Sequence, residues 1–98
     1  MKKILVCCNA GVTTSLLVTK MQQVAKERDM DVEVIAEPLA KAIDYLADAD
    51  VVLLAPQVGF AKSDLENATK APVAVIDADD YARSDASMIL AVAKSLLV

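Results

Sequence analysis

Four short apolar runs alternate along the chain with longer segments of helical period. The runs cover residues 4–7, 32–36, 51–55 and 73–76. The first and third are continuously apolar, which is typical of strands buried on both faces of a sheet. The second run alternates between apolar and charged residues, and this pattern favours a partly exposed edge strand. The pattern therefore predicts four strands with a helical segment after each.

The segments after the four runs predict four helices. Their approximate ranges are residues 14–28, 38–47, 59–68 and 84–97, with Pro38 as the first residue of the second helix and Ser84 or Asp85 as the N-cap of the last. The side chains that this periodicity directs to the core are Leu17, Met21, Val24 and Ala25; Leu39, Ala42, Ile43 and Leu46; Ala61, Leu65 and Ala68; and Ile89, Val92, Ala93 and Leu96.

The order of these elements indicates one α/β domain covering residues 1–98. Strands that alternate with helices form a parallel sheet with right-handed crossovers, so we expect a small doubly wound four-stranded sheet with helices on both faces. In the common strand order 2-1-3-4, the first and third strands are neighbours, and ligands bind beyond their C-terminal ends. The loops at residues 8–14 and 56–59 are therefore the expected site.

Composition excludes several classes of function. The 98 residues include no histidine, which excludes a Ser-His-Asp triad and the usual imidazole metal sites. The net charge is -4 with scattered basic residues, so we expect no nucleic-acid partner. No apolar stretch approaches the roughly 20 residues of a membrane span. We expect no cofactor and no metal, and we interpret Asp77, Asp79 and Asp80 as surface residues that cap the turn into the last helix.

The loop after the first strand carries the candidate chemistry. It begins at Cys8, and a strand-to-helix loop can direct successive backbone N–H groups into one anion-binding concavity. Hydrogen bonds from these groups to sulfur would favour a thiolate, so Cys8 is the candidate nucleophile. Its neighbour Cys7 belongs to the apolar run and is expected in the core, and a disulfide between adjacent residues would be strained. The expected phosphate-binding residues are Asn9, Ala10, Gly11, Val12, Thr13, Thr14 and Ser15.

Two segments resemble the enzyme IIB component of sugar phosphotransferase systems, in the lactose/cellobiose/chitobiose family. They are residues 4–18, ILVCCNAGVTTSLLV, and residues 49–58, ADVVLLAPQV. The resemblance covers the whole chain. It implies a phosphotransferase whose Cys8 accepts a phosphoryl group from a phosphohistidine of enzyme IIA. Cys8 then passes the group to a cellobiose-, chitobiose- or lactose-like disaccharide held by the membrane-embedded IIC permease.

The same resemblance implies further properties. Residues 9–15 would hold the phosphoryl oxygens, and Gln57 would border the site. The protein would be cytoplasmic, monomeric when alone, and transiently at the inner face of the membrane through IIC. The missing histidine fits this reading, because the IIA partner supplies one.

Two alternatives remain at this stage. The low-molecular-weight tyrosine phosphatases, to which the expected fold is also similar, place a cysteine in the same loop but carry an arginine six residues later, where this chain has Thr14. A phosphatase or arsenate reductase would hydrolyse or exchange the cysteine adduct, and the missing arginine argues against that chemistry. A non-enzymatic redox or binding domain that uses the Cys7-Cys8 pair is the other alternative.

Overall fold

A computed structural model describes residues 1–9 and 12–97 of the chain. Four parallel strands form one sheet in the order β2-β1-β3-β4, which confirms the expected order and the edge position of the second strand. The strands are β1 (Lys2–Cys8), β2 (Val32–Pro38), β3 (Val51–Leu54) and β4 (Val73–Val75).

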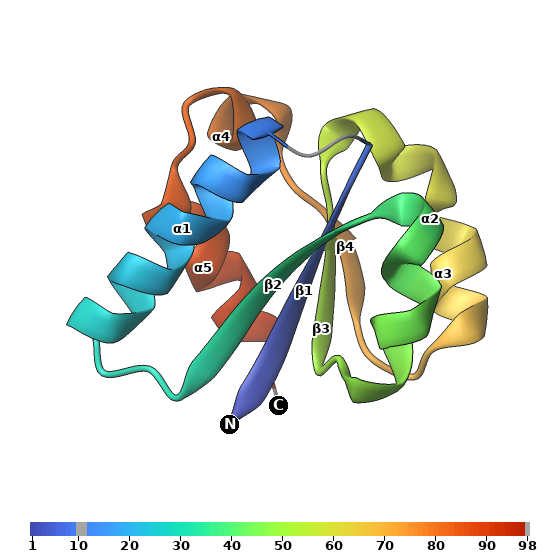
Figure 1. The fold of residues 1–98 in the computed structure, drawn as a ribbon, viewed down its shortest axis with the longest axis horizontal. Coiled ribbons are helices and arrows are strands. Elements are labelled where there is room, and N and C mark those ends of the chain that lie inside the picture. Colours follow the sequence, from blue (N-terminus) through green and yellow to red (C-terminus); the bar gives the residue numbers. More distant parts are fainter. Residues whose placement is uncertain (10–11, 98) are drawn as a thin grey trace.

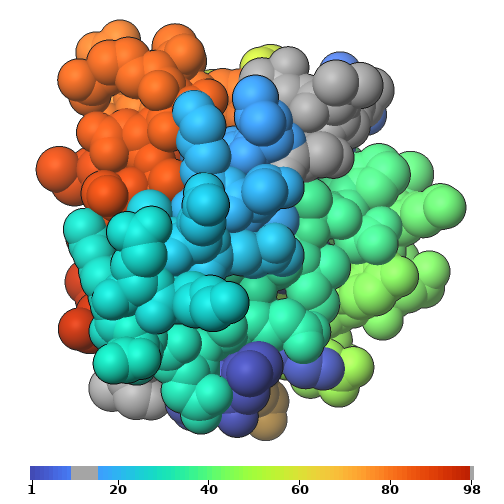
Figure 2. Space-filling view, turned by 60° about the vertical axis from the view of Figure 1, so that its left-hand side comes forward, coloured from blue at the N-terminus to red at the C-terminus, as the bar shows by residue number. Residues whose placement is uncertain are grey.

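Helices cover both faces of the sheet, as the sequence predicted (Figure 1). One layer contains α1 and α5, and the other contains α2, α3 and the 3₁₀ helices η1 and η2. In Figure 2, α1 and α5 pack side by side on the first face. The bounds are α1 (Val12–Glu27), α2 (Leu39–Ala42), η1 (Ile43–Asp48), η2 (Pro56–Ala61), α3 (Lys62–Ala68), α4 (Ala78–Ala82) and α5 (Ala86–Leu96).

The central strands build two cores because successive side chains point to opposite faces. In β1, Ile4 and Val6 contact the layer of α1 and α5, whereas Leu5 contacts the opposite layer. Every residue of β3 is buried, as its continuous apolar run predicted. The two cores fix the sheet between the helical layers, and so fix where each strand ends.

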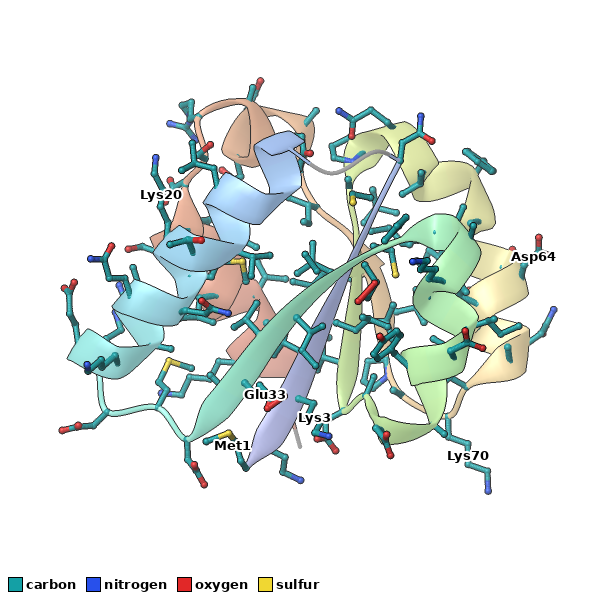
Figure 3. All side chains as sticks on the ribbon, viewed as in Figure 1. Met1, Lys3, Lys20, Glu33, Asp64 and Lys70 are labelled. Carbon is teal, nitrogen blue, oxygen red and sulfur yellow. The ribbon has the colours of Figure 1, made fainter. Side chains whose placement is uncertain are left out.

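The two ends of the sheet differ in character. Figure 3 shows Lys3 and Glu33 near the N-terminal ends of β1 and β2. There the Asp50 carboxylate accepts a hydrogen bond from the Lys3 backbone N–H at 2.8 Å, which joins the starts of β1 and β3. The opposite end gathers the C-terminal ends of the strands, the first turn of α1, η2 and α4 (Figure 1).

Three side chains expected in the core lie at the surface. Ile43 is 64% exposed, Val92 is 42% exposed and Ala68 is also exposed. Ile43 begins a 3₁₀ helix, whose period of three residues changes the direction of the side chains that follow an α-helical turn. Ala68 is the last residue of α3, and Val92 lies at the margin of the α5 face that buries Ile89 and Ala93.

Several element boundaries also differ from the prediction. Pro38 ends β2, and the helix begins one residue later at Leu39. The third predicted helix, residues 59–68, is divided between the end of η2 and α3, which begins at Lys62, and η2 itself contains a kink where Val58 has non-helical backbone angles. The short helix α4 was not predicted, because its five residues are too few to show a period.

Asp77 caps α4. Its carboxylate accepts hydrogen bonds from the backbone N–H groups of Asp79 at 2.9 Å and Asp80 at 3.2 Å, so Asp77 caps this short helix and not the turn into the last helix, whose N-cap is Asp85. Over residues 1–9 and 12–97, no three histidine, cysteine or acidic side chains are placed together as metal ligands. Within the same residues, no helix combines the length and hydropathy that a membrane crossing requires.

Candidate functional site

Cys8 is the last residue of β1, not the first residue of a loop as the sequence suggested. Its side chain is only 3% exposed and packs with the core on the α2 and α3 side of the sheet. The thiol donates a hydrogen bond to the backbone carbonyl oxygen of Glu37, with 3.7 Å between sulfur and oxygen. Strand pairing continues because β2 extends to Pro38, which lies opposite Cys8.

Glu37 and Tyr45 form a polar pair beside this contact. The negative charge of the Glu37 carboxylate, and a hydrogen bond to it, raise the pKa of the Tyr45 phenol above its ordinary value of 10.0. The phenol therefore stays protonated and donates to Glu37, which connects η1 to the end of β2. Sequence reasoning missed Glu37. The residue before a proline favours an extended backbone, so Pro38 could have indicated that β2 reaches this position.

Cys7 is fully buried and faces the core, as the sequence predicted. Burial, together with the neighbouring Cys8, raises the pKa of the Cys7 thiol from 9.0 to about 12. A thiol that keeps its proton is a poor nucleophile. Cys7 is therefore a packing residue, and Cys8 is the candidate for sulfur chemistry.

The first helix begins close to the end of β1. Figure 1 shows the start of α1 at the C-terminal end of the sheet, on the side to which β1 leads. The N-terminus of a helix carries free N–H groups and a partial positive charge, so it favours an anion placed there. Of the expected phosphate-binding residues, Asn9 is described and exposed, and the backbone of residues 12–15 forms the first turn of α1. Ala10 and Gly11 lie outside the described residues.

Gln57, the residue predicted to border the site, lies in η2 at the same end of the sheet and is exposed. The backbone N–H of Ala55 donates to the Cys7 carbonyl at 2.9 Å, so the start of η2 is held against the end of β1. Val58 is buried in the same core as Cys8. The start of η2 thus lies beside the end of β1, as the strand order predicted.

Comparison with known proteins shows which family this chain belongs to. The model of the lactose/cellobiose-specific IIB subunit of the PTS matches residues 3–92. The chain belongs to this family. The oligo-beta-mannoside-specific EIIB component of Bacillus subtilis is 40% identical over 101 residues, which cover 100% of this chain and 98% of that protein. As a PTS IIB subunit, the protein is a sugar-specific component of a phosphotransferase system and has a transferase role.

Two further comparisons bear on fold and on domain arrangement. The lactose-specific IIB domain of Streptococcus pneumoniae matches with a TM-score of 0.88 over 99% of this chain and 98% of that one, at 18% identity, and this likeness confirms the fold. A lactose-specific EIICB component of Lacticaseibacillus casei is 30% identical over 66 residues, which cover 67% of this chain and 11% of that protein. A IIB subunit of this type therefore also occurs as a small part of a much longer chain.

The raised pKa of Cys7 predicts a loss of stability at alkaline pH in this IIB subunit. The unfolded chain releases the Cys7 proton near the ordinary pKa of 9.0, whereas the native protein keeps it until about 12. Between these values the unfolded state binds fewer protons, so the free energy of unfolding falls as pH rises. Urea titrations from pH 8 to 11 should show this fall, and Cys7→Ala should flatten it. An equal slope in both proteins would contradict the assignment.

Proposed function

We propose that this IIB subunit carries a phosphoryl group on Cys8 between a phosphohistidine of enzyme IIA and a disaccharide held by the membrane-embedded IIC permease. The observation that carries the proposal is the position of Cys8. Its backbone ends a buried central strand, beside the first turn of the 16-residue helix α1, at the end of the sheet where parallel α/β folds bind ligands.

Both steps exchange one bond for another at phosphorus. In the first, the N–P bond of the partner's phosphohistidine breaks, an S–P bond forms at Cys8, and the thiol proton ends on the imidazole nitrogen. In the second, the S–P bond breaks, an O–P bond forms at a sugar hydroxyl, and the hydroxyl proton returns to sulfur. Partners supply the base and the acceptor, so the subunit needs a nucleophile and a site for the phosphoryl oxygens.

The hydrogen bond to Glu37 defines the resting state of the nucleophile. As a donor to a carbonyl, the sulfur is a protonated thiol, and a phosphorylated sulfur has no proton to donate. Phosphorylation therefore requires Cys8 to leave Glu37. Sγ would turn toward the N-terminus of α1, where the backbone of residues 9–15 and their hydroxyl groups hold the phosphoryl oxygens, with Gln57 at the border.

A carrier must delay hydrolysis of its phosphocysteine. The two arginines of the chain are Arg28 and Arg83, so neither lies in the segment after Cys8, where phosphatases of similar design hold the phosphoryl oxygens. Without a guanidinium clamp on the equatorial oxygens, attack by water is poorly stabilised. Thr14 at the sixth position after Cys8 therefore favours a carrier over a phosphatase.

A two-stage assay tests this function. The subunit is first phosphorylated by a IIA donor, separated from it, and then added to inverted membrane vesicles that contain IIC. We expect transfer to cellobiose or a related disaccharide and negligible hydrolysis of p-nitrophenyl phosphate. Turnover of the aryl phosphate without labelling by any IIA donor would replace the carrier with a phosphatase. The names of the relatives include oligo-beta-mannoside and lactose, so the sugar panel should contain both types.

A further inference from the structure

The carbonyl group that accepts the Cys8 hydrogen bond lies at the very end of β2. Glu37 is followed by Pro38, the last residue of the strand, and α2 begins at Leu39. The pairing of β1 with β2 also ends here, with Cys8 opposite Pro38. Because a proline has no backbone N–H, it cannot donate to a neighbouring strand. The position of the Glu37 carbonyl therefore depends on what else holds Glu37.

The Glu37 side chain is held by a different element. Glu37 lies opposite Cys7, whose side chain faces the layer of α2 and η1, so the Glu37 side chain is directed to the same layer. There its carboxylate accepts a hydrogen bond from the phenol of Tyr45 in η1. The charges of Glu37 and Asp44 raise the pKa of this phenol, so it remains a donor. The pair thus joins η1 to the end of β2.

The aromatic ring of Tyr45 is itself restricted. Tyr45 lines a pocket of about 260 Å³ together with Leu5 of β1 and Ile35 of β2. Leu5 is buried, and Ile35 packs against the same core. Tyr45 is 38% exposed, so most of its surface is covered. A side chain that is already restricted loses little entropy when it forms a hydrogen bond, which makes Tyr45 an effective support for Glu37.

Resting on the proposed function, we propose that Tyr45 is a positioning residue that holds Cys8 in its resting state. Acting through Glu37, Tyr45 fixes the carbonyl oxygen to which the Cys8 thiol donates, and this contact keeps the sulfur in the core. Phosphorylation requires the sulfur to leave, so the contact lowers the population of the reactive conformation. The Cys8 thiol is therefore held back in the absence of a donor.

Two measurements on the isolated protein test this role. Cys7→Ala leaves Cys8 as the single thiol, and adding Tyr45→Phe to this parent removes only the phenol oxygen. The S–H stretching band in the infrared spectrum reports the hydrogen bond from the thiol, and we expect it to move to higher frequency in Tyr45→Phe. Alkylation by iodoacetamide reports release of the sulfur. We expect its rate to rise about fivefold, as for the loss of one hydrogen bond of ordinary strength.

Two further variants separate positioning from charge and from loosening of the fold. Glu37→Gln keeps an oxygen that accepts from Tyr45, so it should keep the S–H band and the alkylation rate of the parent. Ile43→Ala is the matched control in the same 3₁₀ helix, because Ile43 is 64% exposed. Urea unfolding of each variant gives the share of alkylation that occurs through global unfolding, which the rise in Tyr45→Phe should exceed.

Three results would overturn the positioning role: an unchanged S–H band in Tyr45→Phe, an equal acceleration in Glu37→Gln or Ile43→Ala, or a rise that global unfolding explains. The proposed function has a separate readout, because neither measurement needs a partner. With a IIA donor, Tyr45→Phe should raise kcat/KM for labelling by a similar factor. Absence of labelling in the wild-type protein would refute the proposed function, whereas normal labelling with an unchanged S–H band would refute the positioning role alone.

Discussion

Replacing Cys8 with serine should abolish both transfer steps. Serine has nearly the same shape, but its hydroxyl is a far weaker nucleophile than a thiolate, and the chain has no histidine to activate it. We expect Cys8→Ser to take no detectable phosphoryl group from IIA and to support no sugar phosphorylation. A labelling assay with radioactive phosphate measures both steps. The fold should be retained, because Cys8 packs at the end of β1 and the substitution removes little volume.

Cys7→Ala is the control for this result. The Cys7 side chain is fully buried and its thiol keeps its proton, so its removal should lower stability without preventing labelling of Cys8. A Cys8→Ser protein that still relays phosphate to sugar would contradict the proposed role. If labelling were lost in Cys7→Ala but kept in Cys8→Ser, and both proteins remained folded, the nucleophile would be Cys7 and not Cys8.

Leu54→Ala should cause a large loss of stability. Leu54 ends the central strand β3, is fully buried and lies opposite Cys7 of β1. Truncation removes its transfer free energy and leaves a cavity between the sheet and its helices, which together cost about 3 kcal/mol. Urea unfolding followed by circular dichroism measures this difference as a lower midpoint at a similar slope.

The matched substitution at the surface is Ile43→Ala. Ile43 is 64% exposed, so its truncation should change the free energy of unfolding by less than about 0.5 kcal/mol. A loss below about 1 kcal/mol for Leu54→Ala would show that this part of the sheet repacks easily. In that case the end of β1 would not be held rigidly, and the account of how Cys8 is positioned would fail.

The architecture could be predicted because it depends on patterns that many residues share. The continuous apolar runs of the two central strands require burial on both faces, and the period of α1 predicted that Leu17 and Met21 would be buried. Local exceptions could not be predicted in this way. Ile43 follows one α-helical turn, but the chain continues as a 3₁₀ helix, which directs this side chain to solvent.

The candidate site was predicted in part. The apolar run correctly placed Cys7 in the core, but the end of a strand depends on its neighbour, and β2 extends pairing to Cys8. The acceptor of the Cys8 thiol is a backbone carbonyl on that neighbour, so no side-chain motif marks it.

Mass spectrometry of the protein after incubation with a phosphohistidine-bearing IIA donor tests the central claim most directly. The sample is kept at neutral pH to preserve phosphocysteine. Fragment ions from cleavage between Cys7 and Cys8 then show which of the two sulfur atoms carries the phosphoryl group. The account predicts one added phosphoryl group per chain, located on Cys8. A phosphoryl group on any other residue, or an unmodified chain with every donor that labels a known IIB subunit, would contradict it.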